Sequence, residues 1–108
     1  MHLPFELAKV KLLHSGSPFF GLFSHGTLLL ELYKPDQIDH QTPHTRDEVY
    51  IIASGSGKFV EDGIIVDITV HDFLFVRAGV EHRFIEFTED FSAWVIFYGP
   101  EDGESQDI

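Results

Sequence analysis

Apolar residues recur at helical spacing in one stretch of the chain, close to its N-terminus. This stretch is PFELAKVKLLHSG, residues 4–16. Pro4 suits the first turn of a helix, and Gly16 suits the position just beyond its end. The pattern therefore predicts a short helix within residues 1–16.

Beyond residue 16 the apolar residues form short runs, and residues that favour turns separate these runs. In chain order they are FFGLF, TLLLELY, EVYIIAS, KFV, IIVDITV, FLFV, HRFIEF and FSAWVIFYG. The Asp62–Gly63 pair between two of the runs is typical of a hairpin. Short strands that recur about every ten residues, without helical patterns between them, indicate a β-sandwich or a small barrel. We therefore expect an all-β domain.

The last apolar run and the segment after it have different patterns. Residues 91–99 are apolar on both faces of the expected strand. Such a strand is covered on both sides, which predicts contact with a second sheet and with a second subunit, hence a homodimer. Residues 100–108, PEDGESQDI, are acidic and nearly free of apolar residues, so we expect a flexible tail there.

Composition narrows the class of protein and its partners. The chain has 108 residues, which predicts a single domain over 1–108. Its formal net charge is −11, with only seven Lys and Arg, and binding to nucleic acids or anionic membranes needs clustered positive charge. The absence of cysteine excludes disulfides, thiolate nucleophiles and sulfur-ligated metals. Without a signal-like or membrane-spanning apolar run, we expect a cytoplasmic protein that binds neither nucleic acid nor membrane.

Three residues with metal-binding side chains stand beside turns: His44, Glu48 and His82. On a straight strand His44 and Glu48 would lie about 13 Å apart, so they reach one ion only if the chain turns across residues 45–47, which suit a turn. His82 likewise follows a turn-prone segment, residues 78–81. Two imidazoles and one carboxylate suit divalent Fe, Mn, Ni, Co or Zn. The spacing alone leaves open a hydrogen-bonded core histidine at His82 and a surface ion pair at Glu48.

The same residues resemble the two sequence motifs of the cupin superfamily. The first motif reads G-x5-H-x-H-x(3,4)-E-x6-G, and its second half fits His44, Glu48 and Gly55. The second reads G-x5-P-x-G-x2-H-x3-N, and HDFLFVRAGVEHRFIE follows its spacing, with Gly79 and His82 in place. The resemblance implies a small bacterial cupin, a double-stranded β-helix or jelly-roll barrel. It further implies a divalent metal ion held by His44, Glu48 and His82, and a dimer formed through the sheets.

The chain departs from these motifs at several positions. Thr42, a poor metal ligand, stands where the first motif has its first histidine. Gln41 and His40 are therefore candidates for a fourth ligand, although Gln41 has the wrong strand parity and His40 is farther away. Four positions that are structural in the family also differ, namely Asp36, His71, Arg77 and Glu86.

Four residues are candidates for roles beyond metal binding. Glu86 shares the strand parity of His82, so we expect it to point into the barrel, where it and Tyr50 are candidates for moving protons. The alternative for Glu86 is an ion-paired structural role. Arg77 and Arg83 are candidates for binding an anionic substrate, with solvated or acid-paired surface positions as the alternative.

The resemblance leaves three functions open, because cupins carry out many reactions on one fold. The chain could be a metal-dependent enzyme on a small organic molecule, as a dioxygenase or an isomerase. It could instead bind a small ligand, such as a sugar or a metabolite, without converting it. In the third case the missing histidine has weakened the metal site and only the scaffold persists.

Overall fold

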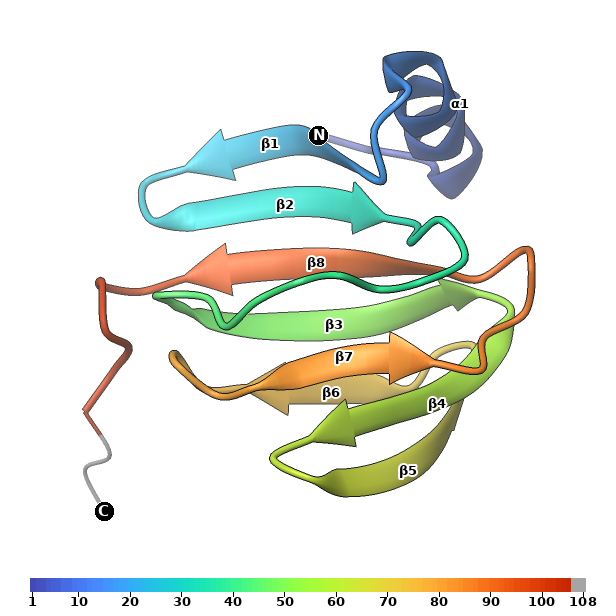
Figure 1. Ribbon diagram of the computed structural model, residues 1–108. Coiled ribbons are helices and arrows are strands. Elements are labelled where there is room, and N and C mark those ends of the chain that lie inside the picture. The colour runs from blue at the N-terminus through green and yellow to red at the C-terminus, as the bar shows by residue number, and fades with distance from the viewer. Residues whose placement is uncertain (106–108) are drawn as a thin grey trace.

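A computed structural model describes residues 1–105 of the chain (Figure 1). These residues form one helix and eight strands. In chain order the elements are α1 (Phe5–Ser15), β1 (Phe19–His25), β2 (Leu28–Tyr33), β3 (Asp47–Ser54), β4 (Ser56–Glu61), β5 (Ile64–Thr69), β6 (Phe73–Val76), β7 (His82–Ile85) and β8 (Ser92–Tyr98). Within this part of the chain, the helix is too short and too polar to cross a membrane.

The strands form two antiparallel sheets, and α1 lies beside β1 at one end of the molecule (Figure 1). The five-stranded sheet has the order β1-β2-β8-β3-β6, and the three-stranded sheet has the order β5-β4-β7. At Gly16 the backbone is left-handed (φ 70°), and the Gly16 N–H bonds to the Leu13 carbonyl, which ends the helix. The predicted all-β fold with a short N-terminal helix is confirmed.

Successive residues of β3 point alternately between the sheets and away from them. Glu48, Tyr50 and Ile52 are buried, while Val49 and Ile51 are partly exposed. Tyr50 and Ile52 belong to a hydrophobic core to which both sheets contribute. Its largest hydrophobic members, each 1% exposed, are Tyr50, Phe59, Phe84 and Phe91. A polar residue on the inner face of β3 therefore has aromatic rings around it in place of water.

The helix covers only part of the outer face of the five-stranded sheet. Ala8 and Leu12 of α1 pack on Leu32 of β2. On the edge strand β6, Phe73 is 63% exposed and Phe75 is 40% exposed. An apolar area of the sheet therefore lies outside the part that α1 covers.

The connection between β2 and β3, residues 34–46, crosses in front of β8 and β3 in Figure 1. Asp39 fixes this connection with a buried carboxylate that accepts four hydrogen bonds. The donors are the Tyr33 hydroxyl, the Gln41 backbone and side-chain amides, and the Phe84 N–H. Because Tyr33 belongs to β2 and Phe84 to β7, one carboxylate links the two sheets.

Asp47, the first residue of β3, binds two other segments. Its carboxylate accepts hydrogen bonds from the Ala78 N–H and the Glu104 N–H, each at 2.9 Å. The Asp102 N–H also bonds to the Thr45 carbonyl. These contacts hold residues 102–104 against the start of β3, within the segment for which the sequence predicts a flexible tail. Residues 106–108 lie outside the described part of the chain.

Candidate metal centre

Three segments bring the candidate ligands together between the sheets. His44 lies just before β3, Glu48 is the second residue of β3, and His82 is the first residue of β7. The chain bends at residues 45–46, so His44 turns back toward Glu48 and does not continue the line of the strand. A hydrogen bond of 2.7 Å from the Gly79 N–H to the His44 carbonyl holds the segment before His82 against this bend. The turns predicted on both sides of the site therefore bring the three side chains together.

The Glu48 carboxylate lies between the two imidazoles. Its Oε1 atom is 2.8 Å from His44 Nδ1 and 2.8 Å from His82 Nε2. One donor atom from each of the three residues lies within 4.8 Å of the other two. Glu48 is 0% exposed, His82 is 4% exposed, and His44 is half-buried. Three ligand atoms at this separation could hold one metal ion.

A hydrogen bond to the backbone orients the His82 ring. Its Nδ1 atom is 2.9 Å from the Val80 carbonyl oxygen. A carbonyl oxygen only accepts, so Nδ1 carries the hydrogen and Nε2 faces Glu48. A histidine held through its other nitrogen in this way is prepared for metal binding through Nε2. Without a metal ion, a proton on Nε2 makes the contact with Glu48.

Burial and pairing have opposite effects on the two buried groups. Burial favours a lower pKa for His82, but its hydrogen bonds with Glu48 and Val80 outweigh burial and raise the pKa above its ordinary value. Burial favours a higher pKa for Glu48, but its hydrogen bonds with His44 and His82 outweigh burial and lower the pKa. In the metal-free centre, the pairing therefore favours the charged forms of both His82 and Glu48.

The second oxygen of Glu48 is independent support for a cation at this place. Glu48 Oε2 is buried and has no hydrogen-bond partner among residues 1–105. Leaving a buried acceptor unbonded costs about 1–3 kcal/mol, and coordination of a cation would remove this cost. Two imidazole nitrogens and a carboxylate are donors that suit divalent Fe, Mn, Ni, Co or Zn. The residues present therefore fit a divalent ion.

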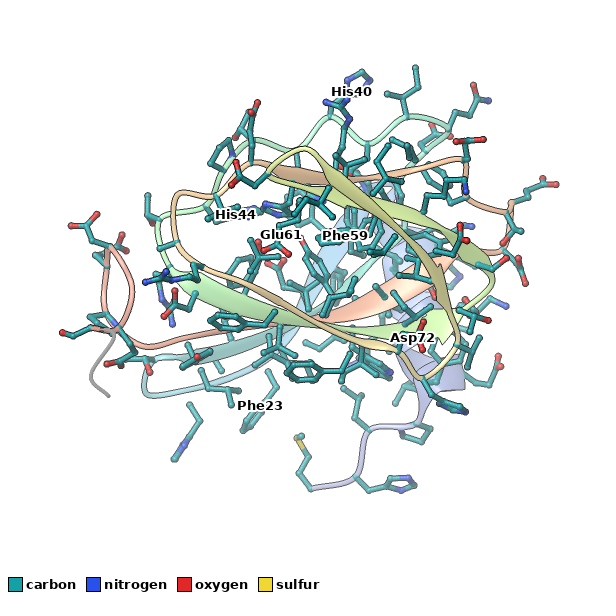
Figure 2. All side chains as sticks on the ribbon, turned by 90° about the horizontal axis from the view of Figure 1, so that it is seen from below. Phe23, His40, His44, Phe59, Glu61 and Asp72 are labelled. Atoms are coloured by element: carbon teal, nitrogen blue, oxygen red, sulfur yellow. The ribbon has the colours of Figure 1, made fainter. Side chains whose placement is uncertain are left out.

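Tyr50 connects the centre to the segment between β2 and β3. Its hydroxyl oxygen is 3.0 Å from His82 Nε2, and the hydroxyl donates to Gln41 Oε1 at 3.0 Å. The Gln41 side-chain amide donates in turn to Asp39 at 2.6 Å. Gln41, one candidate for a fourth ligand, thus lies beside the centre with its oxygen bonded to Tyr50. His40, the other candidate, is exposed at the periphery of the molecule (Figure 2).

The centre opens into a pocket of about 710 Å³, a size typical of sites for small molecules. Its wall is formed by β1, β2, β3 and β8, together with the connection between β2 and β3. The lining residues are Pro18, Phe19, Glu31, Tyr33, Pro35, Asp36, Ile38, His40, Gln41, Thr42, His44, Glu48, Tyr50, Val95 and Phe97.

Three residues singled out from the sequence lie away from this pocket. Arg77 and Arg83 are exposed and do not line it. The prediction that Glu86 points into the barrel is wrong. The strand β7 ends at Ile85, and Glu86 has a left-handed backbone (φ 48°), so strand alternation no longer applies and the side chain is exposed.

Two carboxylates near the centre belong to no sequence motif. Glu31 lines the pocket, and Glu61 is the partner of His82 in the pairing of β4 with β7. Burial raises the pKa of both side chains. The sequence signal for Glu31 is a single charge within the apolar run TLLLELY, and this signal does not say what the charge faces.

Comparison with known proteins places the fold and the motifs in one family. Residues 29–97 match the family described as Cupin domain. The chain belongs to the cupin family. Over 63 residues this cupin is 35% identical to an uncharacterized protein of Streptomyces coelicolor, and the match covers 58% of this chain and 60% of that protein.

Solved structures share the fold of this cupin at low sequence identity. An RmlC-like cupin from Shewanella frigidimarina has a TM-score of 0.65 and 20% identity, over 74% of this chain and 73% of that one. The DMSP lyase DddQ from Ruegeria pomeroyi also has a TM-score of 0.65 and 20% identity, over 75% of this chain and 46% of that one. The chain thus spans less than two thirds of both the Streptomyces protein and the lyase. At these identities, the likeness to the solved structures establishes the fold alone.

Proposed function

We propose that this cupin binds a divalent metal ion through His44, Glu48 and His82, and that a small organic molecule binds beside the ion. The geometry of Glu48 carries this proposal. One of its oxygens lies 2.8 Å from both imidazoles, and the other is buried without a partner. Glu48 also lines the pocket of about 710 Å³. A bound divalent ion would act as a Lewis acid on an oxygen of the organic molecule.

Tyr50 would form part of the pocket wall beside that molecule, with its hydroxyl hydrogen directed to Gln41. Burial, followed by the charges of Glu48 and Asp39, raises the pKa of Tyr50 well above its ordinary value. The phenol therefore stays protonated near neutral pH, and it is not a general base. Gln41 accepts from the hydroxyl and fixes its direction. The proton-moving role first considered for Glu86 is not part of the proposal, because that side chain is exposed outside the pocket.

The proposal covers both conversion and simple binding of the organic molecule. A dioxygenase or an isomerase would convert it beside the ion, whereas a binding protein would release it unchanged. Turnover of a bound molecule by the metal-loaded protein, followed by mass spectrometry of the products, distinguishes the two.

Metal content tests the proposed centre directly. The untagged protein, reconstituted with Fe, Mn, Ni, Co or Zn and then desalted, should retain nearly one ion per chain by elemental mass spectrometry. His82→Ala should lose the ion, because it removes a buried ligand. His14→Ala, which changes an exposed histidine on α1, should keep it. The proposal fails if the wild-type protein retains none of these ions, or if His82→Ala retains as much as the wild type.

We also propose that two copies of the chain pair through the outer face of the five-stranded sheet. On this face Phe73 and Phe75 of β6 lie next to Ile51 and Val49 of β3. The exposure of both phenylalanines, which lie outside the part that α1 covers, supports this proposal. The apolar side chains on the outer face of β8 also support it. Burial of such side chains against a second copy would stabilise a homodimer.

A further inference from the structure

We propose that the ligand of this cupin is a small organic cation whose ammonium group pairs with Glu31 and whose oxygen donor reaches the metal centre. The second half of this inference rests on the proposed function, because it places the oxygen donor beside His44, Glu48 and His82. The first half rests on the charges that line the pocket.

The pocket is lined by acidic side chains but by no Lys or Arg. Glu31, Asp36 and Glu48 line it, whereas none of the seven Lys and Arg of the chain does. Two of these cations, Lys34 and Arg46, donate instead to backbone carbonyls outside the lining. A ligand with a carboxylate or phosphate tail pointing away from the metal centre would therefore find no Lys or Arg to offset its charge. This distribution also argues against the anionic substrate first considered for Arg77 and Arg83.

Glu31 is the acidic residue placed to meet a cation at a distance from the centre. On the inner face of the five-stranded sheet, Glu31 of β2 pairs with Val95 of β8, and Val95 pairs with Tyr50 of β3. Two strand spacings, about 10 Å between backbones, therefore separate Glu31 from Tyr50, and one small molecule can touch both. None of the three ion pairs within residues 1–105 includes Glu31.

A cationic ligand would offset the unfavourable negative charge of the partly buried Glu31. Burial raises the pKa of Glu31, so the surroundings penalise its negative charge, and an ammonium group beside it would remove that penalty. An anionic group at the same place would add to it. The aromatic side chains of Phe19, Tyr33 and Phe97 also line the pocket, and aromatic faces attract cations. The oxygen donor of the ligand would remain free to approach the end of the pocket that His44 and Glu48 line.

Three catechols of similar size test this inference, because they share the catechol ring and carry side chains of different charge. Dopamine is a cation, 4-ethylcatechol is neutral and 3,4-dihydroxyphenylacetate is an anion. Each is titrated near neutral pH into the zinc-loaded protein by calorimetry, and zinc content is measured before and after. We expect dopamine to bind about tenfold more tightly than the anion, because attraction of the cation and repulsion of the anion each contribute a few-fold.

Variants of Glu31 separate its charge from its size. Glu31→Gln keeps the shape and removes the charge, so the preference for dopamine should fall to about twofold or less. Glu31→Asp keeps the charge and should keep the order of affinities. Glu86→Gln makes the same charge change outside the pocket and should leave the order unchanged.

The outcomes separate this inference from the proposed metal centre. The inference is overturned if the anion binds as tightly as dopamine, or if the preference for dopamine survives in Glu31→Gln. If the wild-type protein retains neither zinc nor Fe, Mn, Ni or Co, the metal centre is refuted. The same titrations on the ion-free protein then decide the role of Glu31. A preference for dopamine that is lost in Glu31→Gln still supports the pairing of the ammonium group with Glu31, and the absence of any preference overturns that pairing.

Discussion

Replacing Asp39 by Asn would remove one of the two carboxylate oxygens that hold the connection between β2 and β3. Asp39 is 5% exposed. Its Oδ1 accepts from the Tyr33 hydroxyl at 2.5 Å and from the Gln41 N–H at 3.0 Å. Its Oδ2 accepts from the Gln41 side-chain amide at 2.6 Å and from the Phe84 N–H at 2.8 Å. Asparagine has the same shape but one acceptor oxygen, so in either orientation two donors lose their acceptor and face an amide that also donates.

The expected loss of stability follows from these donors. Each buried donor left without a partner costs about 1–3 kcal/mol, and the two remaining bonds lose the strength that the negative charge gives them. We therefore expect Asp39→Asn to lower the free energy of unfolding by about 3–5 kcal/mol. Since 1 kcal/mol corresponds to about 4–8 °C for a domain of this size, the melting temperature should fall by about 12 °C or more.

Urea unfolding, followed through the fluorescence of Trp94, measures this loss. The control is Asp36→Asn, because Asp36 is exposed in the same connection and should change the free energy of unfolding by no more than about 0.5 kcal/mol. A loss below about 1 kcal/mol in Asp39→Asn would refute the reasoning, since it would mean that the four hydrogen bonds do not hold the connection in solution.

Two further predictions concern pH and oligomeric state. The raised pKa of His82 stabilises the metal-free fold below the ordinary histidine value, and this contribution is lost as pH rises through the raised pKa. The lowered pKa of Glu48 stabilises the fold above the ordinary value of 4.5, and this contribution is lost as pH falls through the lowered pKa. Because zinc must displace the His82 proton, adding zinc should raise the melting temperature more near pH 7.5 than near pH 5.5. Scanning fluorimetry at equal zinc concentrations measures this rise, and an equal or smaller rise at the higher pH would contradict the prediction. In analytical sedimentation the wild-type chain should be a dimer, and the double variant Phe73→Glu with Phe75→Glu should be a monomer. The control Ile64→Glu changes a residue that is 70% exposed on β5 and should leave the dimer intact. A monomeric wild type, or a double variant that still dimerises, would exclude the proposed face.

The sequence predicts those parts of the molecule that local patterns control. Apolar runs and turn residues locate the strands, and Pro4 and Gly16 bracket the helix. Motif spacing singles out His44, Glu48 and His82 as candidate metal ligands, because the turns beside them are themselves visible in the sequence.

The remaining parts of the site depend on register and on single backbone angles. The place of Glu31 beside the centre follows from the pairing of β2 with β8 and of β8 with β3, which no short pattern encodes. The four hydrogen bonds of Asp39 join residues on different sheets. Strand alternation predicts the wrong orientation for Glu86, because alternation holds only while a strand continues. The strand β7 ends at Ile85, and Glu86 itself has a left-handed backbone.

The carboxylate of Asp47 has a consequence for where this cupin can be cut or fused. The last strand ends at Tyr98, which suggests a fragment boundary at that residue. A chain shortened there would lose the Glu104 N–H and leave one buried oxygen of Asp47 without that donor. The other oxygen of Asp47 holds Ala78, in the turn that leads to His82. Expression fragments and fusion partners should therefore begin or end beyond Glu104, because a junction directly after β8 would disturb a segment that supports the proposed metal ligands.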